Sequence, residues 1–588
     1  MCGIAGVFGR VAEREIAAAV QALDHRGPDD AGQWSDPAVP ATLGHRRLSI
    51  LDLSAAGHQP FASADGRFHL VFNGEIYNFR AVRAELEQHG HVFRSATDTE
   101  VIPAAYAQWG RDFVHRLRGM FAFALLDSRP PDGRPRLLLV RDRLGIKPLV
   151  YGRRDGAWWF ASEVRALLAT GVFPRRLDPD GLLDFLAWGA AVQPRTLVDG
   201  LRMVPPGHLL ELCGDRAATW RYWDLHEATA AQRAAAAGWG DEEAAARTRA
   251  ALEDATRHHL VSDVPVGAFL SGGVDSAAAV ALMGRQTARP VQTFCVGFDP
   301  PLGAVDESAQ AAETAQFLGA RHQACRLAPD DAAALFPQAV RALDQPSGDG
   351  FNTWLVARAA RAVVKVAISG LGGDEFWAGY PHFADPAYQA ADAPYQNLRR
   401  VLADRDLRFG LRGPWGGRLA GHLRAFRAGL AVPAGDAVQR MSYVEQSHYL
   451  RDTLLRDSDA MSMAHGLELR PVLLDHVLVE HAYALAPGQK LRGGQTKFAL
   501  KQAVRAWLPP GLEQRPKTGF GLPYAGWMSG PLRPLFEHLL ASPAAGTLLS
   551  RSFRLELGLR LRGGCPPARL WTLGTLWAWL EQERFEIG

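Results

Sequence analysis

The feature that most constrains the fold is an alternation of helical and strand patterns that begins near residue 248. Segments of helical periodicity alternate there with short apolar segments bounded by turn residues. This order predicts a parallel sheet with helices on its faces. After about residue 380 the chain becomes mostly helical. We therefore expect an α/β domain with a helical C-terminal part, with helices over 251–260, 277–286, 306–319, 394–405 and 570–584 and strands over 266–270, 291–298 and 320–327.

The first 210 residues follow a different pattern, in which turn residues separate many short strand-like segments. A chain of 588 residues is too long for one hydrophobic core, so a second domain is expected. We predict an α+β domain over 1–215, an Ala-rich link over 225–247 and a second domain over 228–588. The first domain is expected to have strands over 4–8, 42–51, 68–73, 121–127, 136–141 and 158–161 and helices over 16–23 and 79–88.

The overall charge gives no reason to expect nucleic acid or a membrane as a partner. The chain has 65 Lys and Arg against 62 Asp and Glu, and the formal net charge of +3 is spread along it. No uncharged apolar run approaches the ~20 residues of a membrane span, and the N-terminal apolar run is too short for a signal peptide. The five cysteines show no C-x-x-C spacing that indicates zinc. We expect a cytoplasmic chain that acts on small molecules.

Cys2 stands out because of its position in the chain. Removal of Met1 would place a thiol and a free α-amine on the same residue. A free cysteine with a pKa of ~8.5 is mostly protonated at neutral pH and needs a base to become a nucleophile. A neutral α-amine is one of the few bases that take this proton without a histidine. Cys2 is therefore a candidate nucleophile, against the alternative of a small buried residue in a first strand.

Loops between the first-domain strands carry groups that suit a glutamine side-chain amide as the target of Cys2. Asn73 and the Gly74 N–H are suitable donors for an oxyanion hole. Arg47 suits the carboxylate of the amino acid, while Asp98 and Glu75 suit its ammonium.

A second candidate site follows the strand predicted at 266–270, where the sequence reads "SGGVDS" before a helix. Glycines allow close approach of a ligand, and serine hydroxyls with helix N-terminal N–H groups bind phosphate. It is not a Walker loop, because no G-K-[ST] follows. Asp275 would repel phosphate unless Mg²⁺ lay between them. The stretch "SGLGGDEF" also follows a strand, so Asp275 and Asp374 are candidate ligands of one Mg²⁺ ion.

Taken together, these motifs resemble the glutamine-hydrolysing asparagine synthetases over roughly residues 1 to 540. The motifs that carry the resemblance are "MCGIAGVFG", "HRGPD", "HRRLSILD", "NGEIYN", "RDRLGIKPL", "SGGVDS", "SGLGGDEFWAGY", "DSDAMSMAHGLELR" and "RPKTGFGLP". The resemblance implies an N-terminal nucleophile (Ntn) αββα sandwich, a type 2 glutamine amidotransferase, followed by an α/β PP-loop ATP pyrophosphatase domain of the adenine nucleotide α-hydrolase-like kind. Ammonia from the first site would reach an acyl-adenylate at the second through an internal channel, and ATP would leave as AMP and pyrophosphate.

The resemblance also assigns roles to individual residues. It implies Cys2, Asn73, Gly74 and Lys517 as catalytic, with Lys517 near the adenylate. The implied glutamine-binding residues are Arg47, Leu48, Ser49, Ile50, Leu51, Asn73, Gly74, Glu75 and Asp98. The implied ATP-binding residues are Leu270, Ser271, Gly272, Gly273, Val274, Asp275, Ser276, Val296, Ser369 and Gly370, with Asp275 and Asp374 as Mg²⁺ ligands. Members of this family often dimerise, so a homodimer is one possible assembly.

One departure from the family pattern leaves the acceptor open. Asparagine synthetases carry an acidic residue in the S-G-[E/D]-G loop, where this chain has Leu371. The resemblance implies conversion of aspartate to asparagine. The alternative is an amidotransferase of the same mechanism acting on another carboxylate, such as a sugar uronic acid or a secondary-metabolite precursor, for which 344–361 would shape the pocket. A non-catalytic relative is disfavoured because Cys2, both aspartates and Lys517 are all present, and β-lactam-forming relatives lack the N-terminal cysteine.

Overall fold

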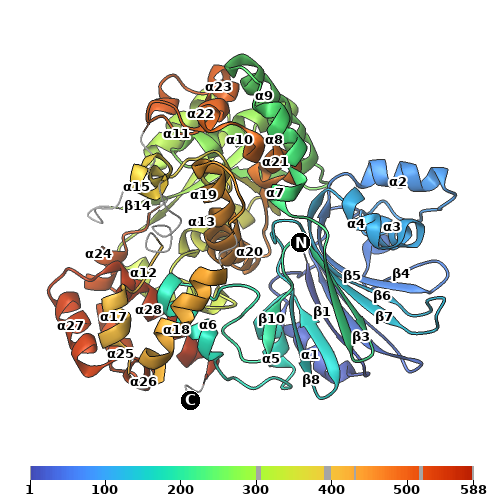
Figure 1. Cartoon of the computed structure of the whole chain (residues 1–588), viewed down its shortest axis with the longest axis horizontal. Helices are drawn as coiled ribbons and strands as arrows, with labels where there is room; N and C mark the ends of the chain where they lie inside the picture. Colours follow the sequence, from blue (N-terminus) through green and yellow to red (C-terminus); the bar gives the residue numbers. More distant parts are fainter. Residues whose placement is uncertain are drawn as a thin grey trace.

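The computed structural model describes residues 2–299, 306–389, 399–412, 414–429, 432–515 and 521–585. Two six-stranded sheets, antiparallel throughout, form the N-terminal domain, at the right of Figure 1. The first has the order β10-β8-β9-β1-β3-β2, with β1 (Gly3–Phe8), β2 (Asp30–Asp36), β3 (Val39–Arg47), β8 (Val150–Arg154), β9 (Ala157–Ala161) and β10 (Leu201–Met203). The second has the order β12-β11-β7-β6-β5-β4, with β4 (Phe61–Ala62), β5 (Phe68–Ile76), β6 (Gly119–Asp127), β7 (Arg136–Arg141), β11 (His208–Cys213) and β12 (Arg216–Arg221).

The two sheets enclose one apolar layer and carry helices on their outer faces. Ile4 and Leu43 of the first sheet pack with Val71, Ala124 and Leu139 of the second, and all five are fully buried. Helices α1 (Glu13–Ala22) and α5 (Val164–Ala169) cover the first sheet, while α2 (Phe79–Gln88) and α3 (Val101–Trp109) cover the second. This arrangement confirms the predicted αββα sandwich. Strand β12 continues the second sheet beyond residue 215, the predicted end of the first domain.

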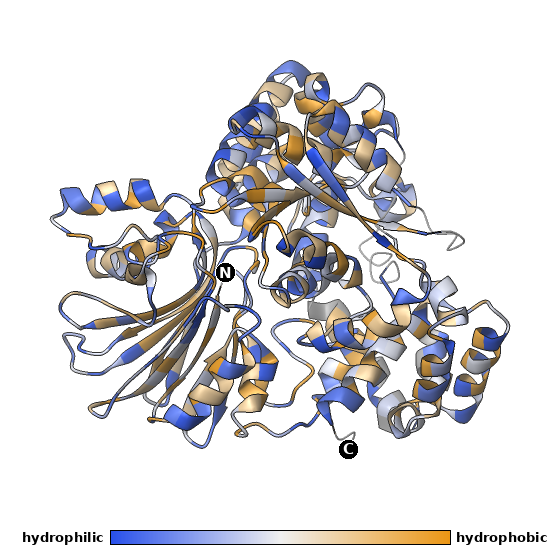
Figure 2. Ribbon diagram, turned by 180° about the vertical axis from the view of Figure 1, so that it is seen from behind, coloured by the Kyte–Doolittle hydropathy of each residue, from blue (hydrophilic) through white to orange (hydrophobic). Residues whose placement is uncertain are grey.

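The second domain is built on a five-stranded parallel sheet with the order β15-β14-β13-β16-β17. Its strands are β13 (Val266–Phe269), β14 (Gln292–Phe298), β15 (Arg321–Leu327), β16 (Val366–Ser369) and β17 (Glu468–Pro471). Helices pack on both faces of the sheet through their apolar side chains. Figure 2 shows apolar residues in the sheet and mixed polarity in the surrounding helices. The main helices are α9 (Asp241–His259), α10 (Val274–Gln286), α11 (Ser308–Phe317), α12 (Asp331–Ala342), α13 (Phe351–Arg361), α14 (Gly373–Phe376), α20 (Arg456–Met463) and α21 (His476–Ala484).

The C-terminal part is helical, as predicted, and Figure 1 shows several of its helices grouped together at the lower left. These helices are α17 (Asp404–Gly410), α18 (Pro414–Gly429), α25 (Arg533–Ala541), α26 (Pro543–Leu548), α27 (Arg551–Arg562) and α28 (Ala568–Glu583). No helix within the described residues is long and apolar enough to cross a membrane.

Two predicted elements need correction. The strand expected over 42–51 ends at Arg47, after which residues 48–51 leave the sheet. In the helix expected over 394–405, residues 394–398 lie outside the described residues, and residues 399–403 form turns and bends rather than a helix. Arg399 in this segment lies 3.7 Å from the ring centre of Tyr449 and pairs with Glu445 at 3.1 Å. Tertiary contacts of this kind override local helix propensity.

Candidate active site

Cys2 lies at the start of β1, next to the predicted oxyanion residue. Its backbone N–H donates a hydrogen bond to Asn73 Oδ1 at 3.0 Å, and the residue is 8% exposed. Burial raises the pKa of the Cys2 thiol, while a backbone hydrogen bond from Leu48 and the charge of Arg47 oppose this rise. A thiol in this environment is mostly protonated at neutral pH, so the nucleophile requires a base beside it.

Asn73 and Gly74 have the properties of an oxyanion hole. Asn73 is fully buried on β5, and its Nδ2 has no hydrogen-bond partner in the described part of the chain. An unused buried donor is costly, which indicates an acceptor that arrives with the substrate. Gly74 has φ +155°, and a Cβ at this position would lie 2.2 Å from the Met120 carbonyl oxygen. Only glycine therefore fits next to Asn73.

The predicted ammonium-binding residues Glu75 and Asp98 are buried near one another. Asp98 Oδ2 accepts the Ile76 N–H at 2.8 Å, and burial raises the pKa of Asp98 to about 7. Burial, together with the charge of Glu468, also raises the pKa of Glu75. An arriving ammonium would favour the ionised form of both carboxyl groups.

The remaining predicted glutamine-binding residues, Arg47, Leu48, Ser49, Ile50 and Leu51, end β3 and begin the loop after it. The Arg47 guanidinium donates to the carbonyl oxygens of Ser54 at 2.9 Å and Leu51 at 3.3 Å, and it also bonds Asp52. Arg47 therefore holds this loop against the end of its own strand. Ser49 N–H donates to Asp29 at 2.8 Å.

Arg470 of β17 connects the first site to the second domain. This fully buried residue pairs with Glu75 at 3.3 Å and with Glu468 of its own strand. Its Nη1 also donates to the carbonyl oxygens of His259 and Val261, each at 2.7 Å. The guanidinium thus neutralises two buried carboxylates, one from each domain.

Replacing Arg470 with Met is expected to destabilise the protein by about 3–5 kcal/mol, because two buried carboxylates lose their cation. Urea unfolding followed by tryptophan fluorescence measures this loss. The matched control is Arg153→Met, which breaks an ion pair with Asp215, whose side chain is 82% exposed. This control should cost less than about 1 kcal/mol. Equal losses in the two variants would contradict the role given to Arg470.

A second buried connection starts at Cys2. Arg26 Nε donates to the Cys2 carbonyl oxygen at 3.0 Å. The same guanidinium pairs with Glu163 at 2.7 Å and with Asp459 of α20 at 2.8 Å. Lys147 reaches the other oxygen of Asp459 at 3.3 Å. Sequence analysis had not identified these contacts, and those of Asp459 join residues more than 300 positions apart.

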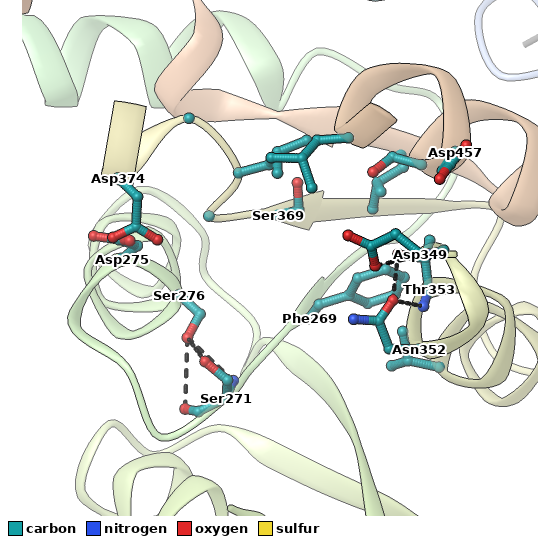
Figure 3. A pocket seen from close by; sticks show the side chains of 18 of the residues that line it. Phe269, Ser271, Asp275, Ser276, Asp349, Asn352, Thr353, Ser369, Asp374 and Asp457 are labelled. Atoms are coloured by element: carbon teal, nitrogen blue, oxygen red, sulfur yellow. Dashed lines mark hydrogen bonds between the residues drawn. The ribbon is translucent and has the colours of Figure 1, made fainter. Parts of the chain in front are cut away.

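The "SGGVDS" loop lies at the carboxyl end of β13, on a cavity of about 400 Å³ (Figure 3). Ser271 Oγ lies 3.0 Å from Ser276 Oγ, and α10 begins directly after the glycines. Of the predicted ATP-binding residues, the cavity is lined by Leu270, Ser271, Asp275, Ser276, Ser369 and Gly370. The other four, Gly272, Gly273, Val274 and Val296, do not line it.

Asp275 and Asp374 lie close together, and a lysine side chain lies between them. The Lys497 ammonium pairs with Asp374 Oδ1 at 2.6 Å and also with Asp275 Oδ2. Although burial disfavours the charged form of Lys497, the two carboxylates raise its pKa above the usual value. Sequence analysis missed this residue because a single lysine after "GGQT" carries no signal of its own.

The carboxylate pair also fits the predicted Mg²⁺ ion. Two hard oxygen donors from the first turns of α10 and α14 converge on one point, and Mg²⁺ completes its coordination with waters and phosphates. No cluster of three or more His, Cys, Asp or Glu residues that could hold a metal occurs among the described residues. The phosphates of a bound nucleotide would therefore be needed to complete such a site.

Leu371 lines the same cavity, as does the buried Glu375. Burial and the neighbouring Asp374 raise the pKa of Glu375 to about 7, and Tyr380 donates a hydrogen bond to it at 2.6 Å. Lys517, predicted near the adenylate, lies outside the described residues.

Comparisons with known proteins agree with the two-domain architecture. Residues 1–223 match the glutamine amidotransferase domain family, and residues 247–581 match the asparagine synthase family. An N-terminal nucleophile amidotransferase fold followed by a parallel α/β domain is the class of protein that this structure defines. The chain belongs to the asparagine synthase family, whose members use ATP.

Three similar proteins illustrate the range of this family. A putative glutamine-hydrolysing asparagine synthetase of Mycobacterium bovis is 34% identical, covering 98% of this chain and 95% of its own. The glutamine-hydrolysing asparagine synthetase 1 of Bacillus subtilis is 28% identical, covering 95% and 92%. The amidase chry2 of Gibberella zeae is 27% identical, covering 95% and 94%.

Proposed function

We propose that this chain is a glutamine-dependent, ATP-dependent ligase that converts a carboxylate to its amide through an acyl-adenylate. The observation that supports this most strongly is the presence of two sites in one chain. One is a buried N-terminal thiol beside an unused amide donor, and the other is a cavity bordered by two glycine-rich strand-end loops.

At the first site, Cys2 Sγ attacks the side-chain carbonyl carbon of glutamine after Met1 is removed. The free α-amine takes the thiol proton and gives it to the leaving ammonia. Asn73 Nδ2 and the Gly74 N–H stabilise the oxyanion. Water then hydrolyses the thioester, so that one glutamine and one water yield one glutamate and one ammonia.

At the second site, an oxygen of the acceptor carboxylate attacks the α-phosphate of ATP, and pyrophosphate leaves. Ser271 and Ser276 with the N-terminus of α10 bind the phosphates. Mg²⁺ held by Asp275 and Asp374 would offset their negative charge. Lys497 lies between these carboxylates and is placed to shift towards pyrophosphate. Ammonia then attacks the acyl carbon, AMP leaves, and a proton is released.

Two acceptors have specific support. Aspartate is favoured by the names of the bacterial relatives. Another carboxylic acid is favoured by Leu371, an apolar side chain that lines the cavity where the resemblance implied an acidic one, and by the fungal amidase among the relatives. Pyrophosphate release from ATP and glutamine over a panel of carboxylic acids tests both. Release with aspartate alone supports asparagine synthesis, and release with another acid only supports the second.

We propose that a small cavity next to the large one is part of a passage for ammonia from the first site. It has a volume of about 10 Å³, and Lys147 and Asp459 line it at one side. Leu371, Ser458 and Leu469 line both this cavity and the large one. A cavity of this size admits a molecule no larger than water or ammonia.

Filling this passage should uncouple the two reactions. Ile146 lines the small cavity but not the large one, so Ile146→Trp is expected to leave both glutamine hydrolysis and ammonia-dependent synthesis largely intact. Glutamate would then form in excess over pyrophosphate. The ratio of the two products measures coupling, and Ile146→Leu, which conserves volume, is the control. An unchanged ratio in Ile146→Trp would place the ammonia path elsewhere.

A further inference from the structure

Arg26 brings three segments of the chain together through the three nitrogens of one side chain. It lies in the turn after α1 and is fully buried. Its Nε donates to the Cys2 carbonyl oxygen at 3.0 Å, and its Nη1 donates to Glu163 at 2.7 Å. Its Nη2 pairs with Asp459 of the second domain at 2.8 Å. Each nitrogen of the guanidinium therefore has a partner, and the partners come from three separate segments.

The planar guanidinium makes these three contacts depend on one another. Its nitrogens form a rigid fork, so two of them, once fixed, determine where the third one points. Although burial favours the neutral form of Arg26, Asp459 and Glu163 raise its pKa above the usual value, so the side chain stays charged. The direction in which Nε donates to Cys2 is thus set by one carboxylate from each domain.

Both carboxylates are themselves held in place by further contacts. Glu163 lies 3.1 Å from His25 Nε2 and pairs with Arg165 at 3.0 Å. Asp459 pairs through its other oxygen with Lys147 at 3.3 Å, and its side chain is 3% exposed. Buried groups with several charged partners have little freedom to move, so they fix the Arg26 guanidinium firmly.

Cys2 depends on this arrangement because its backbone makes two polar contacts on either side of the thiol. Its N–H donates to Asn73 Oδ1 at 3.0 Å, and its carbonyl oxygen accepts from Arg26. The side chain branches from the Cα between these two groups, so a shift of the carbonyl moves Sγ relative to the oxyanion donor. A displacement of about 1 Å at a reacting atom can cost about 100-fold in rate.

The helix that carries Asp459 also borders both cavities. Asp457, labelled in Figure 3, and Ser458 line the large cavity, whereas Ser458 and Asp459 line the small one. Three consecutive residues of α20 thus contact the second site, the proposed passage for ammonia and Arg26. An element of the second domain therefore contributes to the structure around the Cys2 thiol.

We propose that Asp459 is a positioning residue for glutamine hydrolysis, which orients Arg26 so that Arg26 holds Cys2 for attack. This inference rests on the proposed function and adds a residue of the second domain to its first site. Since Asp459 acts through Arg26, its loss slows the attack of the thiol rather than weakening the binding of glutamine. The residues predicted to bind glutamine, such as Arg47, have contacts of their own.

Asp459→Ala in the full chain is expected to lower the kcat of glutamate formation about tenfold or more while changing the KM of glutamine less than about threefold. Ammonia-dependent release of pyrophosphate should stay within about twofold, because Asp459 is not among the described residues that line the large cavity. Asp459→Asn, which keeps the volume of the side chain, repeats the test. Its one oxygen cannot serve both Arg26 and Lys147 as the carboxylate does, so we expect a loss of about threefold or more in kcat.

Asp475→Ala is the matched control, because Asp475 also joins the two domains without contacting Arg26. It belongs to the second domain and pairs with Arg118 of the first at 2.8 Å, and its side chain is 1% exposed. It also caps the N-terminus of α21, so its loss disturbs the structure at least as much. This variant should keep the kcat of glutamate formation within about twofold. An equal fall in Asp475→Ala and Asp459→Ala would indicate a general effect of domain contact and contradict the proposal.

A double variant tests whether Asp459 acts through Arg26. Arg26→Lys keeps a positive charge between the carboxylates but lacks the fork that reaches three partners, so it should also lower the kcat of glutamate formation. Adding Asp459→Ala to Arg26→Lys should lower this kcat by no more than about twofold further. Losses that multiply would show that Asp459 acts independently of Arg26, and the positioning role would be wrong.

These outcomes separate the proposal from the function on which it rests. Unchanged glutamate formation in Asp459→Ala overturns the role of Asp459 while leaving the amidation reaction standing. A parallel loss of ammonia-dependent synthesis in both Asp459 variants indicates general damage and overturns it as well. Failure of the unmodified protein to form glutamate from glutamine would overturn the proposed function itself.

Discussion

Cys2→Ala is expected to abolish glutamine-dependent amide synthesis while leaving ammonia-dependent synthesis intact. Loss of a nucleophile that no other group replaces lowers the rate by about 1,000-fold or more. The second site does not lose any group, because the described residues that line its cavity all belong to the second domain. Measurement of glutamate and pyrophosphate with glutamine or ammonium chloride as nitrogen source gives both rates.

The Cys2→Ala variant preserves the buried contacts at the start of β1. Cys2 packs at 8% exposure and bonds Asn73 and Arg26 through its backbone, so alanine retains both hydrogen bonds. Cys213→Ala, at a partly exposed cysteine on β11, controls for loss of a thiol in general. Loss of ammonia-dependent synthesis in Cys2→Ala would contradict two separable sites. If intact-mass analysis found Met1 still attached in protein with full glutamine activity, the α-amine of Cys2 could not be the base.

Patterns within short stretches of the sequence predicted the fold well. The strands over 266–270, 291–298 and 320–327 match β13, β14 and β15 to within a residue at each end. Each of these segments is defined by its own periodicity and turn residues, which are local properties. The helix prediction was wrong at residues 399–403. Arg399 contacts Tyr449 and Glu445, and the local sequence does not encode these contacts.

Residues of the candidate sites were predictable from the sequence where they belong to a recognisable motif. Residues outside such motifs were not. Cys2 and Asn73 belong to recognisable motifs, and the structure brings them within 3.0 Å. Lys497 and Arg26 contribute one side chain each to sites built mainly from other segments. Their roles depend on which strands and helices become neighbours, so only the folded chain reveals them.

The same dependence on long-range contacts applies to the charges between the domains. Arg26 and Arg470 are fully buried and pair with carboxylates of the opposite domain. A buried arginine is costly unless it is paired, so each of these residues specifies one relative position of the two domains. In that position Ile146 and Lys147 of the first domain line the small cavity together with Leu371 of the second.

Asp275→Asn is expected to abolish pyrophosphate release with either nitrogen source, while glutamine hydrolysis at Cys2 continues. Asp275 lines the nucleotide cavity, and its carboxylate faces Lys497 and Asp374. Asparagine keeps the shape of the side chain but removes the charge that would bind Mg²⁺ and orient Lys497. Loss of one group that stabilises developing charge costs about 100-fold or more in rate.

The two activities of this variant separate an effect on the nucleotide site from general damage. Glutamate production should stay within about twofold of the unmodified protein, because the substitution lies in the other domain and Lys497 keeps its ion pair with Asp374. Thermal stabilisation by ATP with Mg²⁺ gives a readout that does not depend on turnover, and the variant should lose it. Asp215→Asn should retain both the stabilisation and pyrophosphate release. Unchanged pyrophosphate release in Asp275→Asn would remove this residue from the phosphate and metal site.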